Sequence, residues 1–310
     1  MRTVAKIVVA LVWIVTTPWS SAESGEAFLT PWGHPDLQGV WDYRTITPLE
    51  KPTELGERNS FTQSEAEQFT ETNPDRQAEA FRPLLAVGGE PWADVGTKLS
   101  EGARASLLYD PPSGRLPSKT DFGKQHAART MERFVGAPDN PEDRPEQERC
   151  IIYPRIPLES GQYNNNIQIF QTPDHVVLLM EMFHDARIVP LDGRPNLPIK
   201  GWLGQSRGYY EGDTLVVETS GFRPVANFVG YSAQRTVVER FTRLDETTLL
   251  YDYSVDDPGA FTASWSARQT LSDRNEKIYE YACHEGNYSM VNMLRGARIQ
   301  EAEQLGSSGP

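Results

Sequence analysis

Four side chains in this sequence have the chemical types and the surroundings needed for proton transfer. Glu181, His184 and Asp185 lie together in the motif EMFHDAR at 181–187, and Glu239 lies between apolar residues in a later segment. Histidine titrates near neutral pH and can shuttle a proton when a carboxylate orients it. A carboxylate on an apolar strand face is either paired or poised for acid or base chemistry. We therefore expect these four residues to be catalytic.

A structural role for these acids is the alternative. Each could form an internal ion pair with an arginine, for which the sequence offers Arg187, Arg240, Arg243 and Arg268. His184 and Asp185 could simply cap a turn.

Two further motifs are considered and set aside. The E-x-x-H spacing at 181–184 suits a metal site on a helix, but this segment is typical of a strand, where the two side chains point to opposite faces. A site made by His184 and His284 with a carboxylate stays open, although we expect neither metal nor cofactor. GQSRG at 204–208 matches the serine-hydrolase elbow, but a predicted hairpin follows it instead of a helix.

A second group of residues is expected to bind a ligand. The run Tyr163, Asn164, Asn165 and Asn166 offers amides beside an aromatic ring, which suits a hydroxylated or carbohydrate-like molecule. Asparagine-rich turns also occur for conformational reasons alone. The other residues expected to bind substrate are Arg187, Tyr253, Trp265, Tyr281, His284 and Tyr288.

The second half of the chain must position these residues, and its pattern predicts strands. They are expected at 167–171, 176–183, 186–190, 214–219, 236–244, 248–256, 263–271 and 277–283. Because short turns join most of them, neighbouring strands must be antiparallel. A sheet of this size relieves its edges by closing, so we predict a mainly β protein with an up-and-down barrel.

The first half is rich in proline, glycine and charge. We expect residues 23–157 to form an irregular N-terminal region that wraps over the barrel, with helices at 64–71 and 121–134 and a first strand at 37–43. Residues 158–310 should hold the barrel and a C-terminal helix at 288–304, whose stripe of Met290, Met293, Leu294 and Ile299 could pack on the barrel. The two parts are expected to form one domain.

The first 22 residues are expected to be a secretory signal peptide. Arg2 and Lys6 precede the apolar run 7–15, and small residues at 20–22 end at Ala22. The run is much shorter than the roughly 20 residues needed to span a bilayer. An export signal predicts a periplasmic or secreted protein with no membrane span.

Composition limits the partners. The formal net charge is −13, and hydrophobic residues make up 38% of the chain. The charge disfavours nucleic acid, because that partner attracts clustered positive charge. The apolar content is enough for a packed core. We expect a small-molecule partner.

The two cysteines, Cys150 and Cys283, would meet an oxidising compartment after export. We predict a disulfide between the middle of the chain and its last strand, worth about 4–5 kcal/mol in the chain-entropy model. Two buried free thiols are the alternative.

Several long motifs carry a resemblance to known proteins. They are TPWGHPDLQGVW at 30–41, YNNN at 163–166, EMFHDAR at 181–187, GDTLVVET at 212–219, VERF at 238–241 and YEYACHEGNY at 279–288. Together they resemble an uncharacterised family of exported bacterial proteins, over nearly the whole mature chain. GVW at 39–41 also resembles the G-x-W of lipocalin-like (calycin) barrels, in which the Trp closes the barrel floor. The first resemblance implies export but assigns no catalytic role.

These observations predict a secreted enzyme that acts on a small molecule. Its chemistry would be a cofactor-free lyase, isomerase or hydrolase step, with His and carboxylates in a barrel pocket. The alternatives are a lipocalin-like binding protein that holds an apolar or hydroxylated ligand unchanged, and a structural protein whose polar motifs only stabilise turns.

Overall fold

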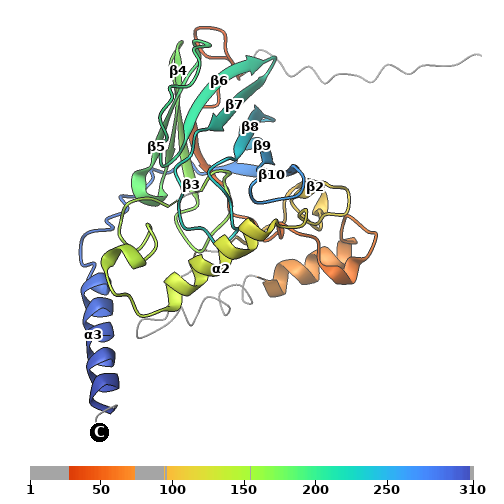
Figure 1. Ribbon diagram of the computed structural model, residues 1–310. Coiled ribbons are helices and arrows are strands. Elements are labelled where there is room, and N and C mark those ends of the chain that lie inside the picture. The colour runs from red at the N-terminus through yellow and green to blue at the C-terminus, as the bar shows by residue number, and fades with distance from the viewer. Residues whose placement is uncertain (1–27, 74–93, 95, 154, 308–310) are drawn as a thin grey trace, which may run out of the picture.

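The computed structural model describes residues 28–73, 94, 96–153 and 155–307, and a mainly antiparallel β-barrel dominates it (Figure 1). The predicted signal peptide lies outside the described residues. The barrel strands are β1 (Gly39–Asp42), β3 (Asn166–Gln171), β4 (His175–Met180), β5 (Ala186–Pro190), β6 (Gln205–Glu211), β7 (Thr214–Ser220), β8 (Thr236–Arg243), β9 (Thr248–Asp256) and β10 (Trp265–Asp273). A short strand, β2 (Leu108–Asp110), pairs with β10 outside this path.

The order of the strands shows where the barrel is only nearly closed. Hydrogen bonds connect β5, β4, β3, β1, β10, β9, β8, β7 and β6 in that sequence, and every pair is antiparallel. Because direction alternates around an odd number of strands, β5 and β6 must run parallel to each other where they meet. The connection between them, residues 191–204, has the dozen or more residues that a parallel crossover needs. No hydrogen-bonded ladder joins β5 to β6, and we call this junction the seam.

At the seam the two strands still pack closely through side chains. A Cβ atom on Gly208 of β6 would lie 2.7 Å from a methyl carbon of Val189 on β5. Only glycine allows that approach without a shift of one strand. Packing therefore closes the barrel where backbone hydrogen bonding does not.

The inward side chains alternate along each strand and fill the barrel. Tyr251, Tyr253 and Val255 of β9 are fully buried, and so are Trp265 and Leu271 of β10. Trp41 of β1 is also buried, and its indole N–H donates to the carbonyl of Leu37 at 2.9 Å. The alternation that predicted half-buried strands is confirmed.

Long connections gather at one end of the barrel. The turns at the opposite end, such as 172–174, 212–213 and 244–247, are short. The connection from β7 to β8 at residues 221–235 is long, and it emerges at the same end as the turn between β4 and β5 and the segment before β3. Loops at one end of a barrel are a common place for a ligand site.

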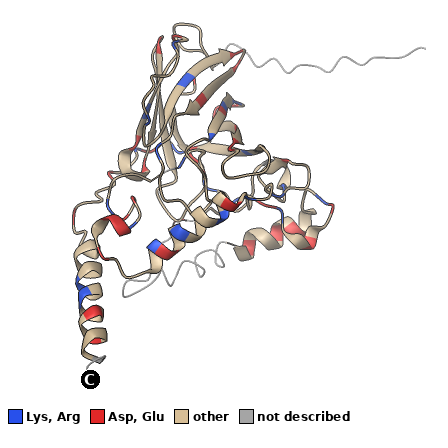
Figure 2. Ribbon diagram, in the orientation of Figure 1, with Lys and Arg blue, Asp and Glu red and all other residues tan. Residues whose placement is uncertain are grey.

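The predicted helices are present. Residues 63–73 are helical, and Thr62 and Glu65 form a capping box at the start of this helix. Helix α2 (Asp121–Val135) begins after Thr120, whose side chain accepts from the N–H of Gly123. Charges of both signs lie along α2 and α3 (Figure 2).

Helix α3 (Ser289–Ser307) does not pack on the barrel as expected. It extends away from the strands (Figure 1), and Arg298 donates to the carbonyls of Pro138 and Asp139 in the connector after α2. Ile299, one residue of the predicted stripe, is 60% exposed. The connector, rather than the sheet, therefore supplies the contacts of this helix.

Two strand predictions are wrong in detail. Residues 277–283 form no strand, although their composition favours one, because β10 already pairs with both β1 and β9 and leaves no free edge there. The strand predicted at 176–183 ends at Met180, and Met182–His184 forms a tight turn, η5. Phe183 and His184 have φ angles of 63° and 51°, which a strand cannot contain.

A buried ion pair crosses the barrel interior. Arg187 of β5 donates to Glu239 of β8 with 3.0 Å between Nη2 and Oε1, and Tyr251 donates to the same carboxylate at 2.8 Å. Arg187 and Glu239 are 3% and 0% exposed. Because β5 and β8 lie on opposite sides of the seam, the pair ties together two strands that no ladder connects.

This geometry predicts how Glu239 responds to substitution. Glu239→Leu leaves the Arg187 guanidinium buried without its partner and should lower the free energy of unfolding by about 3–5 kcal/mol. The double variant Glu239→Leu, Arg187→Met removes both charges and should recover most of that loss. Chemical denaturation of the three proteins measures it. Equal losses in the single and double variants would show that the pair does not act as a unit.

Candidate functional site

Two neighbouring cavities lie beneath the end of the barrel where the long connections gather. The inner pocket, about 200 Å³, lies between residues of the stretches 155–161 and 226–231. The outer cleft, about 570 Å³, is lined by Phe134, Phe183 and Phe228 and by residues of the stretch 281–293. Gln147, Tyr153 and Phe228 line both cavities, so the two lie next to each other.

Six aromatic side chains line the outer cleft, together with polar and acidic ones that include Glu148 and Glu285. The rings of Phe183 and Tyr281 stack with centroids 4.7 Å apart, and Tyr163 stacks near Tyr281 at 6.4 Å. Phe228 meets the ring of Phe134 edge-on at 5.4 Å. Burial and the neighbouring Tyr163 hydroxyl raise the pKa of Tyr281, so its hydroxyl stays protonated. The cleft is suited to a flat apolar group.

The turn after β4 places Phe183 in this cleft. The Glu181 carboxylate accepts from the Asn166 side chain at 2.6 Å and from the N–H of Tyr279 at 3.3 Å. His184 lies 3.0 Å from the carbonyl of Tyr279 through Nε2. Contacts at both ends of the turn therefore hold its left-handed backbone conformation. A residue other than glycine adopts this conformation only at a cost of about 1–3 kcal/mol.

Asp185 follows this turn and is an unusual acid. Burial raises its pKa from 3.8 to about 7, although the N–H of Tyr153 partly offsets the shift. Its Oδ2 atom is buried and has no hydrogen-bond partner among the described residues. Asp185 supports Tyr153, which lines both cavities.

Arg155 is the cation of the inner pocket. Its guanidinium is 6% exposed, donates through Nη1 to the Tyr43 hydroxyl at 3.0 Å and to Asn165 Oδ1 at 3.1 Å, and lies over the ring of Tyr153. No carboxylate of the described residues lies within 4 Å of it. Its hydrogen-bonding partners are therefore neutral.

Glu159 is the acid of the same pocket. It lines the pocket and is partly exposed, although protein surrounds it on most sides. Tyr231 donates a hydrogen bond to its Oε1 at 3.0 Å. Burial raises the pKa of Glu159, and the hydrogen bond from Tyr231 and the charges of Arg155 and Arg235 offset only part of this rise. A pocket-lining carboxyl whose pKa is raised is a candidate general acid or base.

The asparagines predicted to bind ligand are used mainly within the protein. The Asn165 side chain is buried, accepts from the N–H of Gly161 at 2.7 Å and donates to its carbonyl at 3.0 Å. Asn164 has a φ of 53°, and its carbonyl lies 3.3 Å from the Tyr43 hydroxyl. Of the run 163–166, only Tyr163 lines the outer cleft.

The other predicted site residues are dispersed. Glu239, Arg187, Tyr253 and Trp265 lie inside the barrel, away from both cavities. His184, His284 and Tyr288 are exposed. The four residues predicted to be catalytic therefore do not converge on one pocket. No group of three His, Cys, Asp or Glu side chains in the described part of the chain is arranged to hold a metal ion.

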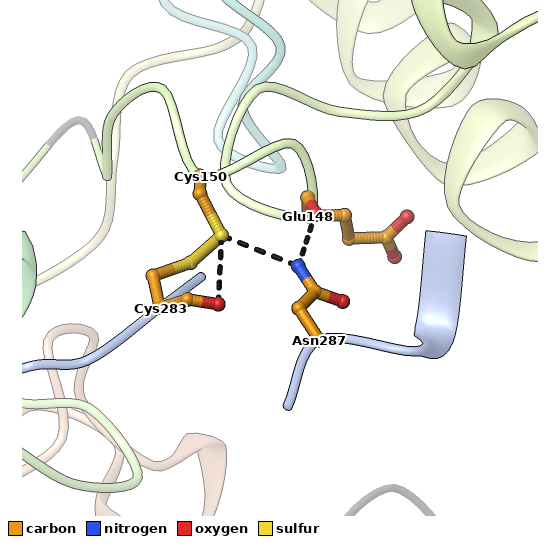
Figure 3. Close-up of a disulfide and its surroundings, with 4 residues drawn as sticks. All are labelled: Glu148, Cys150, Cys283 and Asn287. Carbon is orange, nitrogen blue, oxygen red and sulfur yellow. Dashed lines mark hydrogen bonds between the residues drawn. A yellow bond between two sulfur atoms is a disulfide. The ribbon is translucent and has the colours of Figure 1, made fainter. Parts of the chain in front are cut away.

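A disulfide joins the two walls of the outer cleft, as predicted (Figure 3). It connects Cys150 to Cys283, and the Asn287 side chain donates to the carbonyl of Glu148 at 3.4 Å and lies 3.3 Å from the Cys150 sulfur. Cys283 lies in an irregular segment and not in a last strand. The disulfide therefore holds this segment, which has no sheet partner, against the connector 136–153.

Comparison of the chain with models of protein families, with curated proteins and with solved structures finds no match. Membership in the family of exported bacterial proteins therefore stays a prediction. The helices in the described ranges are all too short or too polar to span a bilayer.

Sequence reasoning missed the residues of the inner pocket. Arg155, Glu159 and Tyr231 lie in stretches interpreted as connectors, because neither stretch has a strand or helix pattern. A signal was present in the run YPRIPLES at 153–160, where two opposite charges stand among apolar residues and prolines. Charged residues in such a run are buried when the chain packs on a core.

The raised pKa of Asp185 predicts a pH-dependent stability. Below about pH 4 this carboxyl is protonated in both the folded and the unfolded protein, so its pKa shift does not destabilise the fold. From pH 4 to about pH 7 only the unfolded protein releases the proton, so the fold becomes increasingly less stable. Asp185→Asn keeps an acceptor for the N–H of Tyr153 and removes the charge. We expect it to raise the melting temperature at pH 8 and to leave it nearly unchanged at pH 4. An equal gain at both values would contradict the burial of a titrating acid.

Proposed function

We propose that this protein is an exported enzyme that performs acid–base chemistry on a small organic molecule in the inner pocket. The observation that carries the proposal is Glu159, a pocket-lining carboxyl whose pKa burial raises. The disulfide agrees with a periplasmic or secreted location, because such bonds persist in oxidising compartments.

The groups around Glu159 support a proton-transfer step. The Tyr231 hydroxyl orients the carboxyl through its hydrogen bond. Arg155 lines the same pocket and supplies a fixed positive charge that would stabilise negative charge developing on a substrate. A carboxyl, a hydroxyl and a guanidinium are sufficient for a lyase, isomerase or hydrolase step, and we expect no cofactor to be required.

Glu159 replaces the residues that the sequence suggested for this role. Glu239 is held in an ion pair, and Glu181 is occupied by backbone and amide donors. His184 contacts the backbone of Tyr279. A catalytic part for them or for Asp185 stays a prediction, and the geometry favours Glu159.

Binding without reaction is the second candidate. The observation that favours it is the outer cleft, whose aromatic rings can hold an apolar ligand but cannot transfer a proton at neutral pH. Under this alternative, Glu159 and Arg155 would only orient the ligand.

Untargeted mass spectrometry of a bacterial extract incubated with the mature protein tests the proposal. We expect one compound to disappear well beyond the amount of protein while another appears. Glu159→Gln keeps the size and the acceptor for Tyr231 but cannot exchange a proton, so it should lower the rate by about 10²–10⁴. Glu218→Gln, on the outer face of β7, is the matched control and should react like the wild type.

Two outcomes would overturn this assignment. Turnover by Glu159→Gln at the wild-type rate would exclude the carboxyl as the acid or base. A compound retained unchanged, in an amount equal to the protein, would favour the binding function instead.

A further inference from the structure

The inner pocket holds a positive charge that the described residues do not neutralise. Arg155 is only 6% exposed, and both acceptors of its Nη1 are neutral oxygens, those of the Tyr43 hydroxyl and the Asn165 amide. A buried guanidinium without a carboxylate is costly, and its planar fork matches a carboxylate in shape. An anionic group on the ligand would compensate this charge.

Glu159 does not fill this role. Its carboxyl hydrogen-bonds to Tyr231 rather than to Arg155, and no contact within 4 Å joins the two side chains. Glu159 therefore leaves the charge of Arg155 without a carboxylate within 4 Å among the described residues.

The outer cleft defines the rest of the ligand. Phe183, Tyr281 and Tyr163 form a stacked group along one side, with interplanar angles of 22° and 6° between successive rings. Phe228 contributes a further ring, and it is 43% exposed. Flat rings that are already nearly parallel favour a flat ligand group over a saturated or branched one.

We propose that the ligand is a planar aromatic carboxylate, with its carboxylate on Arg155 in the inner pocket and its ring against Phe228 and Tyr281 in the outer cleft. Tyr153 and Phe228 line both cavities, so the two are neighbours, as this placement of one molecule requires. This inference rests on the proposed function in its choice of site, but not on any reaction occurring there.

Calorimetric titration of the mature full-length protein with three probes tests the ligand class. 2-Naphthoate should bind, whereas its neutral analogue 2-naphthamide and the non-aromatic cyclohexanecarboxylate should each bind at least ten times more weakly. No binding of 2-naphthoate at millimolar concentration, or equal binding of the amide, overturns the inference.

Variants assign each end of the probe. Arg155→Lys keeps the charge but loses the fork, so it should weaken 2-naphthoate about tenfold or more and leave 2-naphthamide unchanged. Phe228→Leu should weaken both naphthalene probes, whereas Phe170→Leu, at 42% exposure on the outer face of β3, is the matched control and should weaken neither. Because Arg155 also donates to Tyr43, melting temperatures verify that the variants fold. If Arg155→Lys does not fold, Phe228→Leu and its control Phe170→Leu still test the ring site. Unchanged binding in Phe228→Leu overturns the placement of the ring.

The experiment separates this inference from the enzyme proposal. If 2-naphthoate binds as expected and Glu159→Gln turns over the natural compound normally, the ligand class stands and the catalytic role of Glu159 fails. If Glu159→Gln is inactive but the natural substrate has neither ring nor carboxylate, the catalytic role stands and the ligand class fails.

Discussion

Alternation of strand direction around an odd-numbered barrel is the constraint on which the rest of this structure depends. It makes β5 and β6 parallel at the seam, and no backbone ladder joins them there as it joins the other neighbours. Two other interactions hold the strands together at the seam. Gly208 allows β6 to approach Val189, and the Arg187–Glu239 ion pair crosses the interior between strands on opposite sides of the seam.

The same alternation decides where a site can form. Every second connection emerges at the same end of an up-and-down barrel, and the crossover from β5 to β6 shifts the pattern by one. The long connection 221–235, the turn η5 and the stretch before β3 thereby meet at one end. Since the barrel interior is filled by its own side chains, the space for a ligand lies beneath this end and not inside the strands.

The site combines charged groups in the inner pocket with aromatic rings in the outer cleft. Arg155 and Glu159 bring a guanidinium and a carboxyl into one pocket without contacting each other. Neutral oxygens accept from Arg155, and the Tyr231 hydroxyl donates to Glu159. The outer cleft is rich in aromatic rings but also has polar and acidic side chains, and the Cys150–Cys283 disulfide holds its C-terminal wall. The irregular segments therefore have a function of their own, because they form walls that the barrel lacks.

The sequence by itself predicted most of the barrel strands, although not β6 as a strand of its own, together with three helices and the disulfide. Period-two alternation and short turns report local burial, and both survive in the structure with small errors at strand ends. The extra strand at 277–283 was wrong because a composition typical of strands cannot show whether a sheet edge is free. Likewise, the apolar spacing of α3 could not show which part of the protein this helix contacts.

Only the tertiary structure decided which polar residues share a pocket. Glu239 was singled out correctly as an acid on an apolar face, and Arg187 was one of four arginines offered as its partner. Which arginine pairs with it depended on a strand 52 residues away along the chain, across the seam. Arg155 and Tyr231 meet Glu159 because two connectors without regular structure fold under the same barrel end. Contacts between residues so far apart in the chain depend on the order of the strands and on whether their number is odd or even. No local sequence pattern encodes either property.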